Sequence, residues 1–568
     1  MAPDVSLQPV DYIVTLVMLL IPLGIGILFA VRDAHRATRD EYLLGGRRMS
    51  IIPVALSLFA TFASAIALIG TPSEVYYSGP MQPTLLIGFA LSYIVGCFTA
   101  IPLLYPLRLT SVYEYLQLRF DSSLLRMSVV VIGMLQTILY MAIALLTPAL
   151  SLQAAAGIPL WVSVLIIGTV GTVYTAIGGI KSVVWTDVFQ TLVMFAGIFV
   201  MITKGVMTVG GVSSVWSIAD KGGRTSFRSF SPDPRSRHTW WGVIIGGMTM
   251  WLGNIFNQST VQRIYAMKSI NDARLSFVVN ACITLTNMVL LFSVGIVIYA
   301  YFSHIRCDPY NGGLITNRNQ LPPYFVLHTL RDFPGISGIY MSTLFSASLS
   351  TLSSGINALA ANTVEDFLQR PLKKVKESRA TLITKLFVCF YGVLIIGLAY
   401  LADHLKGPVS QMALSVIGAC GGPILGIFLL GASVPCGNKC GALIGSLTAI
   451  SFNIWIVMGH QFYGKKTPLL PSPSTEMCFN NGTVLNDALY VTTAALRNTT
   501  SSYFTPLNGR GDGYGFFLYD ISYEWYGLTG CFVSLTLGAG VSYLTKNCCK
   551  GTTNPELVFP FLRKFWSF

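Results

Sequence analysis

The sequence is poor in charge. Only 11% of its 568 residues are Asp, Glu, Lys or Arg, whereas a soluble domain typically carries about 25%. The chain also has no zinc-ribbon cysteine spacing, no P-loop and no GxGxxG motif at a strand-to-helix junction. No long polar segment is left over for a soluble catalytic domain, so we expect that the protein is not an enzyme.

Acidic and basic residues are especially scarce in the middle of its apolar runs. The histidines His35, His238, His304, His328, His404 and His460 all lie in predicted loops or at helix ends. Proton relays within a membrane generally need Asp, Glu or His at depth, and voltage sensors need an arginine ladder. The sequence therefore disfavours both proton coupling and voltage sensing.

Apolar residues dominate instead, with 53% hydrophobic residues and a mean hydropathy of +0.62. A helix needs roughly 20 apolar residues to cross the hydrocarbon core, and about thirteen segments qualify. These predict an all-α polytopic membrane protein. The first run has basic residues after it instead of before it, so we expect a retained span, not a signal peptide. The expected spans are 10–31, 51–75, 82–105, 127–152, 159–180, 184–206, 240–262, 276–303, 336–362, 382–404, 410–432, 440–460 and 525–545.

Basic residues in short loops indicate the orientation, because such loops stay cytoplasmic. They gather at 32–48, 370–379 and 546–564, which thirteen spans place on one side of the membrane. We therefore expect an extracellular N-terminus and a cytoplasmic C-terminus. The net charge of +13 reflects these loops and does not call for a nucleic-acid partner. The basic segment 207–239 runs against the rule, since it would be extracellular.

The predicted extracellular loop 461–524 carries two glycosylation sequons, at Asn481 and Asn498. They support the same orientation. Cys307 and Cys478 are the two cysteines that clearly fall in extracellular loops. They could form a disulfide, because that compartment is oxidising.

The segment LFSASLSTLSSGINALA, residues 344–360, has six hydroxyl side chains between Ser346 and Ser354. Two interpretations remain open. Na⁺ is a hard cation that prefers oxygen ligands, and hydroxyls provide them without a buried charge. Small hydroxyl residues are also common at contacts between membrane helices. In SLFATFASAIALIGTPSEV, residues 57–75, small and polar residues interrupt an apolar run, and a helix broken there would free carbonyls for an ion.

Six motifs place these observations in one family. The chain resembles the sodium:solute symporters, which include sodium-glucose, iodide, monocarboxylate and multivitamin carriers. The motifs are EYLLGGRRM at 41–49, GTPSEVYYSG at 70–79, LTSVYEYLQLRF at 109–120, YTAIGGIKSVVWTDVFQ at 174–190, NQSTVQR at 257–263 and LSTLSSGINALAANTVED at 349–366. GTPSEVYYSG and NALAANTVED resemble the iodide, monocarboxylate and multivitamin branch.

The resemblance implies a LeuT-type core of two inverted five-helix repeats with accessory helices. The expected divisions are 1–50 for the N-terminus, first span and cytoplasmic loop, 51–208 for the first repeat, 209–239 for an extracellular loop, 240–432 for the second repeat, 433–460 for the twelfth span, 461–524 for the glycosylated loop and 525–568 for the last span and tail.

The resemblance also implies site residues. For Na⁺ it gives the carbonyls of Ala60, Ala63 and Ala347 with the side chains of Ser350 and Thr351. Asp187 and Gln190 match positions on the cytoplasmic sodium exit path, although a solvated charge at a helix end would explain Asp187 equally simply. The positions that match a substrate-facing surface are Phe62, Ser64, Tyr140, Trp251 and Gln258, for whose aromatic members lipid or core packing is the alternative.

The expected function is therefore a plasma-membrane symporter that couples Na⁺ to a small organic anion, either a monocarboxylate or a vitamin with a carboxylate such as biotin or pantothenate. Ala67 stands where iodide carriers have a glutamine, so iodide is not expected. We expect no organic cofactor and no obligatory protein partner. A sodium-independent facilitator or channel, and a ligand sensor without transport, remain as alternatives on the same fold.

Overall fold

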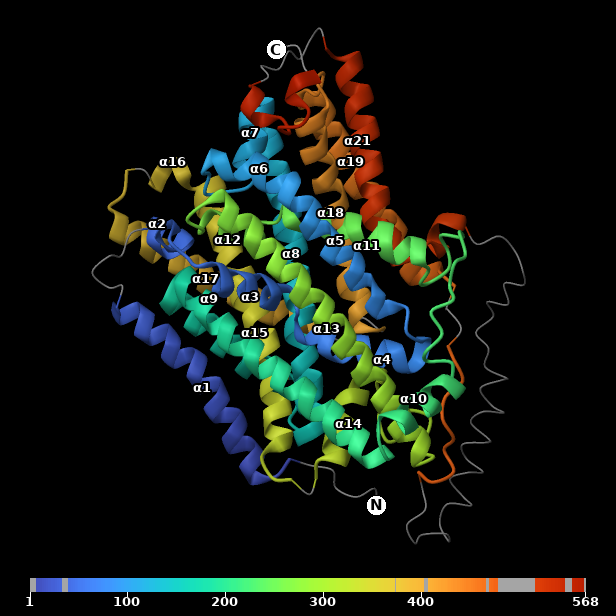
Figure 1. Cartoon of the computed structure of the whole chain (residues 1–568). Coiled ribbons are helices and arrows are strands. Elements are labelled where there is room, and N and C mark those ends of the chain that lie inside the picture. Colours follow the sequence, from blue (N-terminus) through green and yellow to red (C-terminus); the bar gives the residue numbers. More distant parts are fainter. Residues whose placement is uncertain are drawn as a thin grey trace.

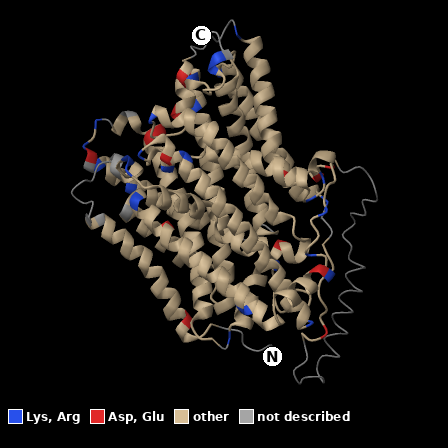
Figure 2. Cartoon of the chain, viewed as in Figure 1, with Lys and Arg blue, Asp and Glu red and all other residues tan. Residues whose placement is uncertain are grey.

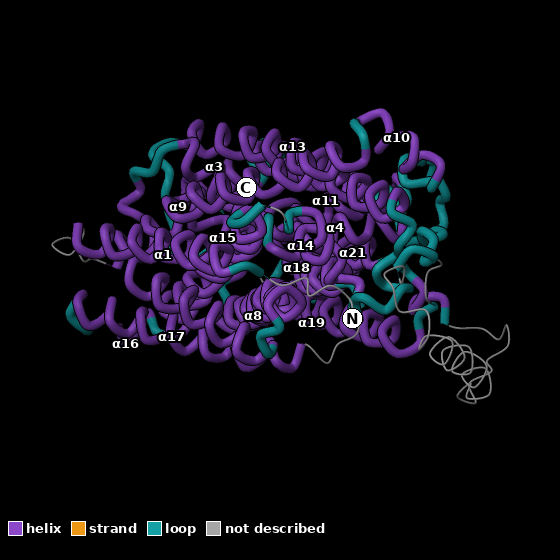
Figure 3. Tube along the Cα trace, turned by 90° about the horizontal axis from the view of Figure 1, so that it is seen from below, coloured by secondary structure: helices purple, strands orange, loops and turns teal. Residues whose placement is uncertain are grey.

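A computed structural model describes residues 7–32, 39–331, 333–372, 374–402, 407–465, 469–478, 516–546 and 554–565. Both sequons, Asn481 and Asn498, lie outside the described residues. Throughout the described part, helices and loops form the whole architecture, and the only β pairing is an isolated bridge between Met49 and Met267 (Figure 3). The expectation of an all-α protein is confirmed.

The helices form a single bundle (Figure 1). They are α1 (Pro9–Arg32), α2 (Arg39–Leu44), α3 (Ile51–Phe62), α4 (Ala65–Ser78), α5 (Leu85–Phe98), α6 (Ala100–Leu104), α7 (Glu114–Phe120), α8 (Ser123–Ala156), α9 (Leu160–Val209), α10 (Val212–Lys221), α11 (Gly247–Ile255), α12 (Gln258–Tyr265), α13 (Ile270–His304), α14 (Leu321–Thr329), α15 (Ile336–Asn362), α16 (Gln369–Leu372), α17 (Glu377–Ala402), α18 (Val409–Ser433), α19 (Lys439–Tyr463) and α21 (Tyr526–Leu544). Short π-helical turns precede α11 at η5 (Gly242–Gly246) and follow α15 at η7 (Thr363–Phe367).

In the part of the chain that the structure describes, helices occupy most of each of the thirteen predicted ranges. Within the described residues, ten helices are long and apolar enough to cross a membrane, or eleven when α3 and α4 count as one bent span. The other two predicted ranges correspond to α15 and to the segment that contains α11 and α12. The number of spans stays a prediction.

Several boundaries differ from the prediction. The expected spans 159–180 and 184–206 share the label α9 but are two helices, Leu160–Ile177 and Gly179–Val209, which meet at a kink at Gly179 with φ 62° and ψ −167°, so only their boundary differs from the prediction. A Cβ at this position would lie 2.7 Å from the ring of Tyr42, so the turn requires glycine both for its backbone angles and for space. The loops expected at 207–239 and after 303 contain α10 and α14.

The first helix of each expected repeat is broken. The second predicted span divides into α3 and α4, which meet at 59°. The seventh divides into α11 and α12 at Phe256 and Asn257. A side chain caps the second half in each case: Ser64 Oγ accepts from Ile66 N–H at 3.2 Å, and Asn257 Oδ1 accepts from Ser259 N–H at 2.9 Å. Matching breaks at the start of both halves are what inverted repeats would produce.

Charged residues concentrate at the periphery of the bundle, and few of them lie in its middle (Figure 2). This distribution suits a lipid environment, in which an unpaired charge is costly. At one edge of the bundle α1 packs on α9 and α15, and at the opposite edge α19 and α21 pack on each other and on α18. The helices between these edges surround the candidate site.

The structure joins Cys307 and Cys478 by a disulfide. The bond fastens the segment after α13 to the segment after α19, 171 positions later in the sequence. The segment around Cys478 is also held by Met477 N–H, which donates to Arg306 O at 3.1 Å. The predicted pairing is therefore geometrically sound.

Cys307→Ser should expose a new thiol at Cys478. Intact cells that express the variant should take up more membrane-impermeant maleimide than wild-type cells, because the orientation proposed below places this pair outside. Cys436→Ser serves as the matched control, since Cys436 is exposed at the opposite end of α19. Equal labelling of the wild type and Cys307→Ser would contradict the disulfide or the orientation.

Candidate functional site

The break between α3 and α4 leaves backbone carbonyls without helical partners. Among the backbone hydrogen bonds of the described residues, none is accepted by Ala60 O or Ala63 O, because Ser64 begins a new helix. The Tyr140 hydroxyl covers the neighbouring position, where it donates to Phe62 O at 3.4 Å. Buried carbonyls normally find a partner. The two exposed by the break are therefore available to a cation, as the resemblance implies.

The hydroxyl-rich part of α15 lies against α3 and α9. Ala347, Ser350 and Thr351 are fully buried there. Thr351 Oγ1 donates to Ala347 O at 3.0 Å, and Ser350 Oγ donates to Asp187 Oδ1 at 2.6 Å. A hydroxyl that donates its proton keeps lone pairs that can bind a hard cation. The predicted side-chain ligands are thus oriented with their oxygens inside the bundle.

Other hydroxyls of the same segment join helices. Ser348 Oγ donates to Ala144 O on α8 at 2.8 Å, and Ser354 Oγ accepts from Thr61 Oγ1 of α3 at 3.1 Å. Both interpretations of the cluster therefore find support, but in different residues. Helix contact explains Ser348 and Ser354, whereas Ser350 and Thr351 belong to the candidate sodium site.

A buried ion pair lies next to this site. Arg263 Nη2 of α12 is 3.1 Å from Asp187 Oδ2 of α9, and neither side chain is exposed. Ser57 Oγ of α3 donates to the same carboxylate at 2.5 Å and accepts from Arg263 Nε at 2.7 Å. The charges are thus compensated within a network that joins four helices, which is the condition for burying an ion pair.

This network corrects two readings of the sequence. Asp187 is not a solvated charge at a helix end, because its side chain is completely buried. Arg263 was missed as a site residue, although it closes the motif NQSTVQR. The break before Gln258 begins a separate helix, whose final turn carries Arg263 to Asp187. No periodicity in the apolar run signalled that break; only the capping residue Asn257 did.

Gln190 lies one turn beyond Asp187 on α9. Its side chain is fully buried, and neither amide atom has a hydrogen-bond partner among the described residues. An unpartnered buried amide favours a nearby polar ligand or water. Its position is consistent with a role beside the ion pair on a sodium exit path, which stays a prediction.

A cavity adjoins the helix break on the α4 side. Four of the five predicted substrate-facing residues line it, namely Phe62, Ser64, Tyr140 and Trp251. Tyr140 also approaches Ser64, whose Oγ lies 3.3 Å from the tyrosine hydroxyl. The cavity therefore begins beside the backbone that would hold the ion.

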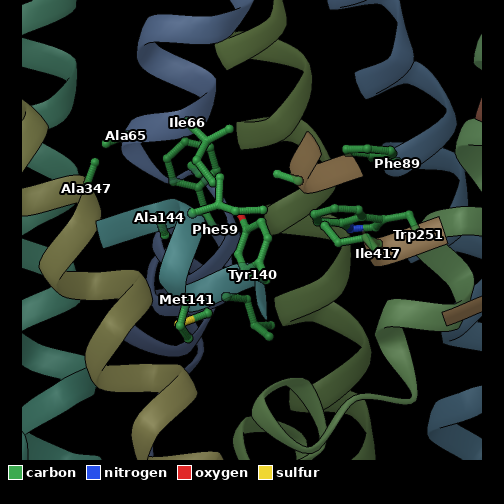
Figure 4. Packing of buried hydrophobic residues seen from close by; sticks show 14 of the residues in the cluster. Phe59, Ala65, Ile66, Phe89, Tyr140, Met141, Ala144, Trp251, Ala347 and Ile417 are labelled. Atoms are coloured by element: carbon green, nitrogen blue, oxygen red, sulfur yellow. The ribbon is translucent and has the colours of Figure 1, made fainter. Parts of the chain in front are cut away.

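Aromatic rings form one wall of this cavity. Trp251 stacks on Phe89 with ring centroids 3.9 Å apart, and it meets Phe62 edge-on at 5.2 Å. Figure 4 shows Trp251, Phe89 and Ile417 gathered on one side of Tyr140, with Ala347 on the other side. Packing alone does not explain these rings, because they also border open space.

Gln258 lies elsewhere. Its Nε2 donates to Thr110 O at 2.7 Å, and its Oε1 accepts from Val112 N–H at 2.9 Å. Both ends of the amide are thus occupied by the segment before α7, and the residue does not line the cavity. The prediction that Gln258 faces the substrate does not agree with the structure, because the break at Asn257 turns the chain away from the cavity.

Polar but uncharged side chains also line the cavity, and the sequence did not indicate them. They are Thr71, Gln82, Thr284, Asn287 and Ser410. The amide oxygens of Gln82 and Asn287 are buried without a hydrogen-bond partner among the described residues. These side chains come from four separate elements, so only the fold could reveal that they converge. These amide oxygens can accept hydrogen bonds from a polar ligand, and the hydroxyl groups of Thr71, Thr284 and Ser410 can donate to one.

Asp187→Asn should destabilise the protein because it leaves Arg263 buried without a counter-charge. Breaking one side of a buried pair costs about 3–5 kcal/mol in the free energy of unfolding. Adding Arg263→Gln should recover part of this loss. Thermal unfolding of the purified full-length variants measures both effects.

Asp233→Asn is the control, since it removes a partly exposed pair with Arg235 whose atoms are 2.8 Å apart. Such surface pairs contribute about 0–1 kcal/mol. If Asp187→Asn unfolded at the same temperature as Asp233→Asn, the structural importance of the buried pair would be refuted.

Comparison with known proteins identifies the family of this chain. The model of the sodium:solute symporter family matches residues 42–449. The chain is 38% identical over 547 residues to sodium-coupled monocarboxylate transporter 1 of Homo sapiens, with 94% of this chain and 87% of that protein covered. It is 37% identical over 559 residues to the sodium-dependent multivitamin transporter of Oryctolagus cuniculus, with 98% and 85% covered.

A solved structure shares the fold. A Na⁺-coupled sialic acid symporter in its substrate-bound, outward-open state aligns with a TM-score of 0.72 at 24% identity, over 94% of this chain and 98% of that one. The whole helical arrangement is therefore common to both proteins. With the family model covering most of the sequence, the chain belongs to the sodium:solute symporter family.

Proposed function

We propose that this protein is a plasma-membrane symporter that uses the sodium gradient to import a small organic anion. The substrate class is a monocarboxylate or a vitamin with a carboxylate, such as biotin or pantothenate. The relatives named as monocarboxylate and multivitamin transporters support this class. The proposal includes no organic cofactor and no obligatory protein partner, only the lipid bilayer.

One observation carries the proposal. The helix α3, which ends at the break and carries Ala60 O, packs on α15, the helix of Ser350 and Thr351. Thr61 Oγ1 donates to Ser354 Oγ at 3.1 Å across this contact. The break also carries Phe62 and Ser64, which line the cavity. Ion and substrate would thus bind to neighbouring parts of a single break. Such adjacency allows each ligand to favour the same conformation as the other, which is the requirement for coupling.

Sodium would hold α3 and α15 together, with Ala347 O completing the set of oxygen ligands. The cavity lies on the α4 side of the break, so this arrangement corresponds to an outward-facing form. Release toward the cytoplasm would then pass Asp187 and Gln190. The gradient supplies the work, since one charge moved through 100 mV contributes about 2.3 kcal/mol.

The orientation is part of the proposal. Basic loops support a cytoplasmic C-terminus and an extracellular N-terminus, and the sequons at Asn481 and Asn498 support an extracellular 461–524 loop. The two matching helix breaks support inverted repeats at 51–208 and 240–432.

Uptake of labelled anions should require sodium. Cells that express the protein should accumulate at least one member of a panel of pyruvate, lactate, butyrate, nicotinate, biotin and pantothenate in Na⁺ medium but not in choline medium. Iodide and glucose serve as negative controls. Uptake without sodium dependence would instead establish a facilitator, and ligand-induced stabilisation without uptake would establish a sensor.

Ser350→Ala combined with Thr351→Ala should raise the sodium concentration for half-maximal uptake about tenfold or more, since each lost oxygen ligand weakens the ion site. Substrate affinity at saturating sodium should change far less. Sodium titrations of uptake measure the difference.

Thr351→Val alone separates ion binding from the ion pair, because Ser350 also donates to Asp187 whereas Thr351 does not. Ser348→Ala is the matched control, since it removes a buried hydroxyl of the same helix that bonds Ala144 O. An unchanged sodium dependence in the double variant would remove these residues from the site.

A further inference from the structure

A second buried acidic group lies away from the candidate site. Glu524 belongs to η9 (Tyr523–Trp525), the turn that leads into α21. None of its side chain is exposed, and neither carboxylate oxygen has a hydrogen-bond partner among the described residues. A charged carboxylate in such a place would be strongly disfavoured, because nothing replaces the water it has lost.

The carboxyl group is tightly enclosed. A Cβ added to Gly242 would overlap Glu524 Oε2, and one added to Gly246 would overlap its backbone carbonyl. Both glycines belong to η5, the π-helical turn that continues into α11. A hydrated cation needs several oxygen ligands and space around them. The enclosure around Glu524 leaves no room for additional oxygen ligands or for a hydrated cation, so the carboxyl group is suited to bind a proton.

His238 does not neutralise Glu524. Its Nε2 lies 3.9 Å from Glu524 Oε1, too far for a hydrogen bond, and 2.9 Å from the Tyr523 hydroxyl. Burial lowers the pKa of His238 to about 4, and the neighbouring Arg237 lowers it further while Glu74 opposes the shift. The imidazole is therefore neutral at physiological pH and carries no charge to offset a carboxylate.

The remaining charges nearby form a pair of their own. Arg237 Nε donates to Glu74 Oε1 of α4 at 2.7 Å, and these two residues are the charged groups that act on Glu524. The helices packed against η9, namely η5, α11 and α18, contain no acidic or basic residue. One arginine thus stands between two buried carboxyl groups, and it is bonded to only one of them.

We propose that Glu524 is a proton-binding site on the extracellular side, and that Arg237 stays bonded to Glu74 as long as Glu524 is protonated. Loss of the proton makes Glu524 a competitor for the guanidinium. Arg237 then shifts away from α4, whose residues Ala67 and Thr71 line the cavity. The charged carboxylate also disturbs its close contact with η5. This turn continues into α11, which carries Trp251. External pH would thereby adjust the outer walls of the cavity without a proton being transported.

The experiment compares uptake of one sodium-dependent substrate by wild-type protein and Glu524→Gln across external pH. The amide has the shape of the neutral carboxyl group and cannot release a proton. Wild-type uptake should fall by about threefold or more as the external medium is made more alkaline, because the site then loses its proton. Glu524→Gln should stay level over the same range, at the rate of the wild type at acidic pH.

Asp520→Asn is the matched control. This acid lies four residues earlier, is partly exposed and accepts from Lys465 N–H at 3.0 Å. It should leave the wild-type pH profile unchanged. A wild type without pH dependence, a Glu524→Gln variant that keeps the wild-type profile, or one that reaches the surface but is inactive at every pH would each overturn the proposal.

A measurement without transport separates this proposal from the proposed function, on which only the uptake readout rests. Infrared difference spectra of the purified full chain, titrated with alkali, should show the C=O band of a protonated carboxyl group disappear. The band should be missing in Glu524→Gln, whether or not that variant reaches the cell surface. Identical bands in both proteins would refute the proton site.

Discussion

The ion pair between Asp187 and Arg263 is the interaction on which the centre of the bundle depends. Two charges withdrawn from solvent need each other and need hydrogen bonds for their remaining atoms. Ser57, Ser350 and Ser354 provide those bonds, the last through Arg263 Nη2 at 2.5 Å. Through these contacts one salt bridge fixes α3, α9, α12 and α15 relative to one another. The inner end of the candidate site is closed by the same contacts.

The proposed sodium site and the ion pair share Ser350, and this sharing has a physical consequence. The pair is neutral as a unit, so a cation bound by Ala60 O, Ala63 O and the hydroxyls meets no net opposing charge. The carboxylate nevertheless orients the Ser350 proton away from the ion, which leaves the oxygen lone pairs for it. Any rearrangement that separates α9 from α15 removes that orientation. In the proposed mechanism, loss of sodium and separation of α9 from α15 are thus linked by the hydrogen bond from Ser350 to Asp187.

Sequence patterns predicted the helices and much of the site, but not its local geometry. Apolar run length located all thirteen helical ranges, because burial in lipid requires such runs. The break near Ala63 was anticipated from small and polar residues in an apolar run, whereas the break at Asn257 was not anticipated, although the apolar run ends at Phe256 and the polar stretch NQSTVQR follows it. Because this break was not predicted, two residues were placed wrongly or overlooked. Gln258 was expected at the cavity but lies elsewhere, and the position of Arg263 beside Asp187 was not foreseen. Residues such as Gln82 and Asn287 converge only through tertiary packing.

The bond between Cys307 and Cys478 also sets an order of events during biosynthesis. The 171 positions between them include α14, α15, α17, α18 and α19. At about 5–20 residues per second, the ribosome needs on the order of 10–30 s to make that stretch. In the proposed orientation, Cys307 stays a reduced thiol through this interval in an oxidising compartment. Its bond to Cys478 can form only after α15, which carries part of the proposed sodium site, has been synthesised. The disulfide therefore forms only when the chain is nearly complete.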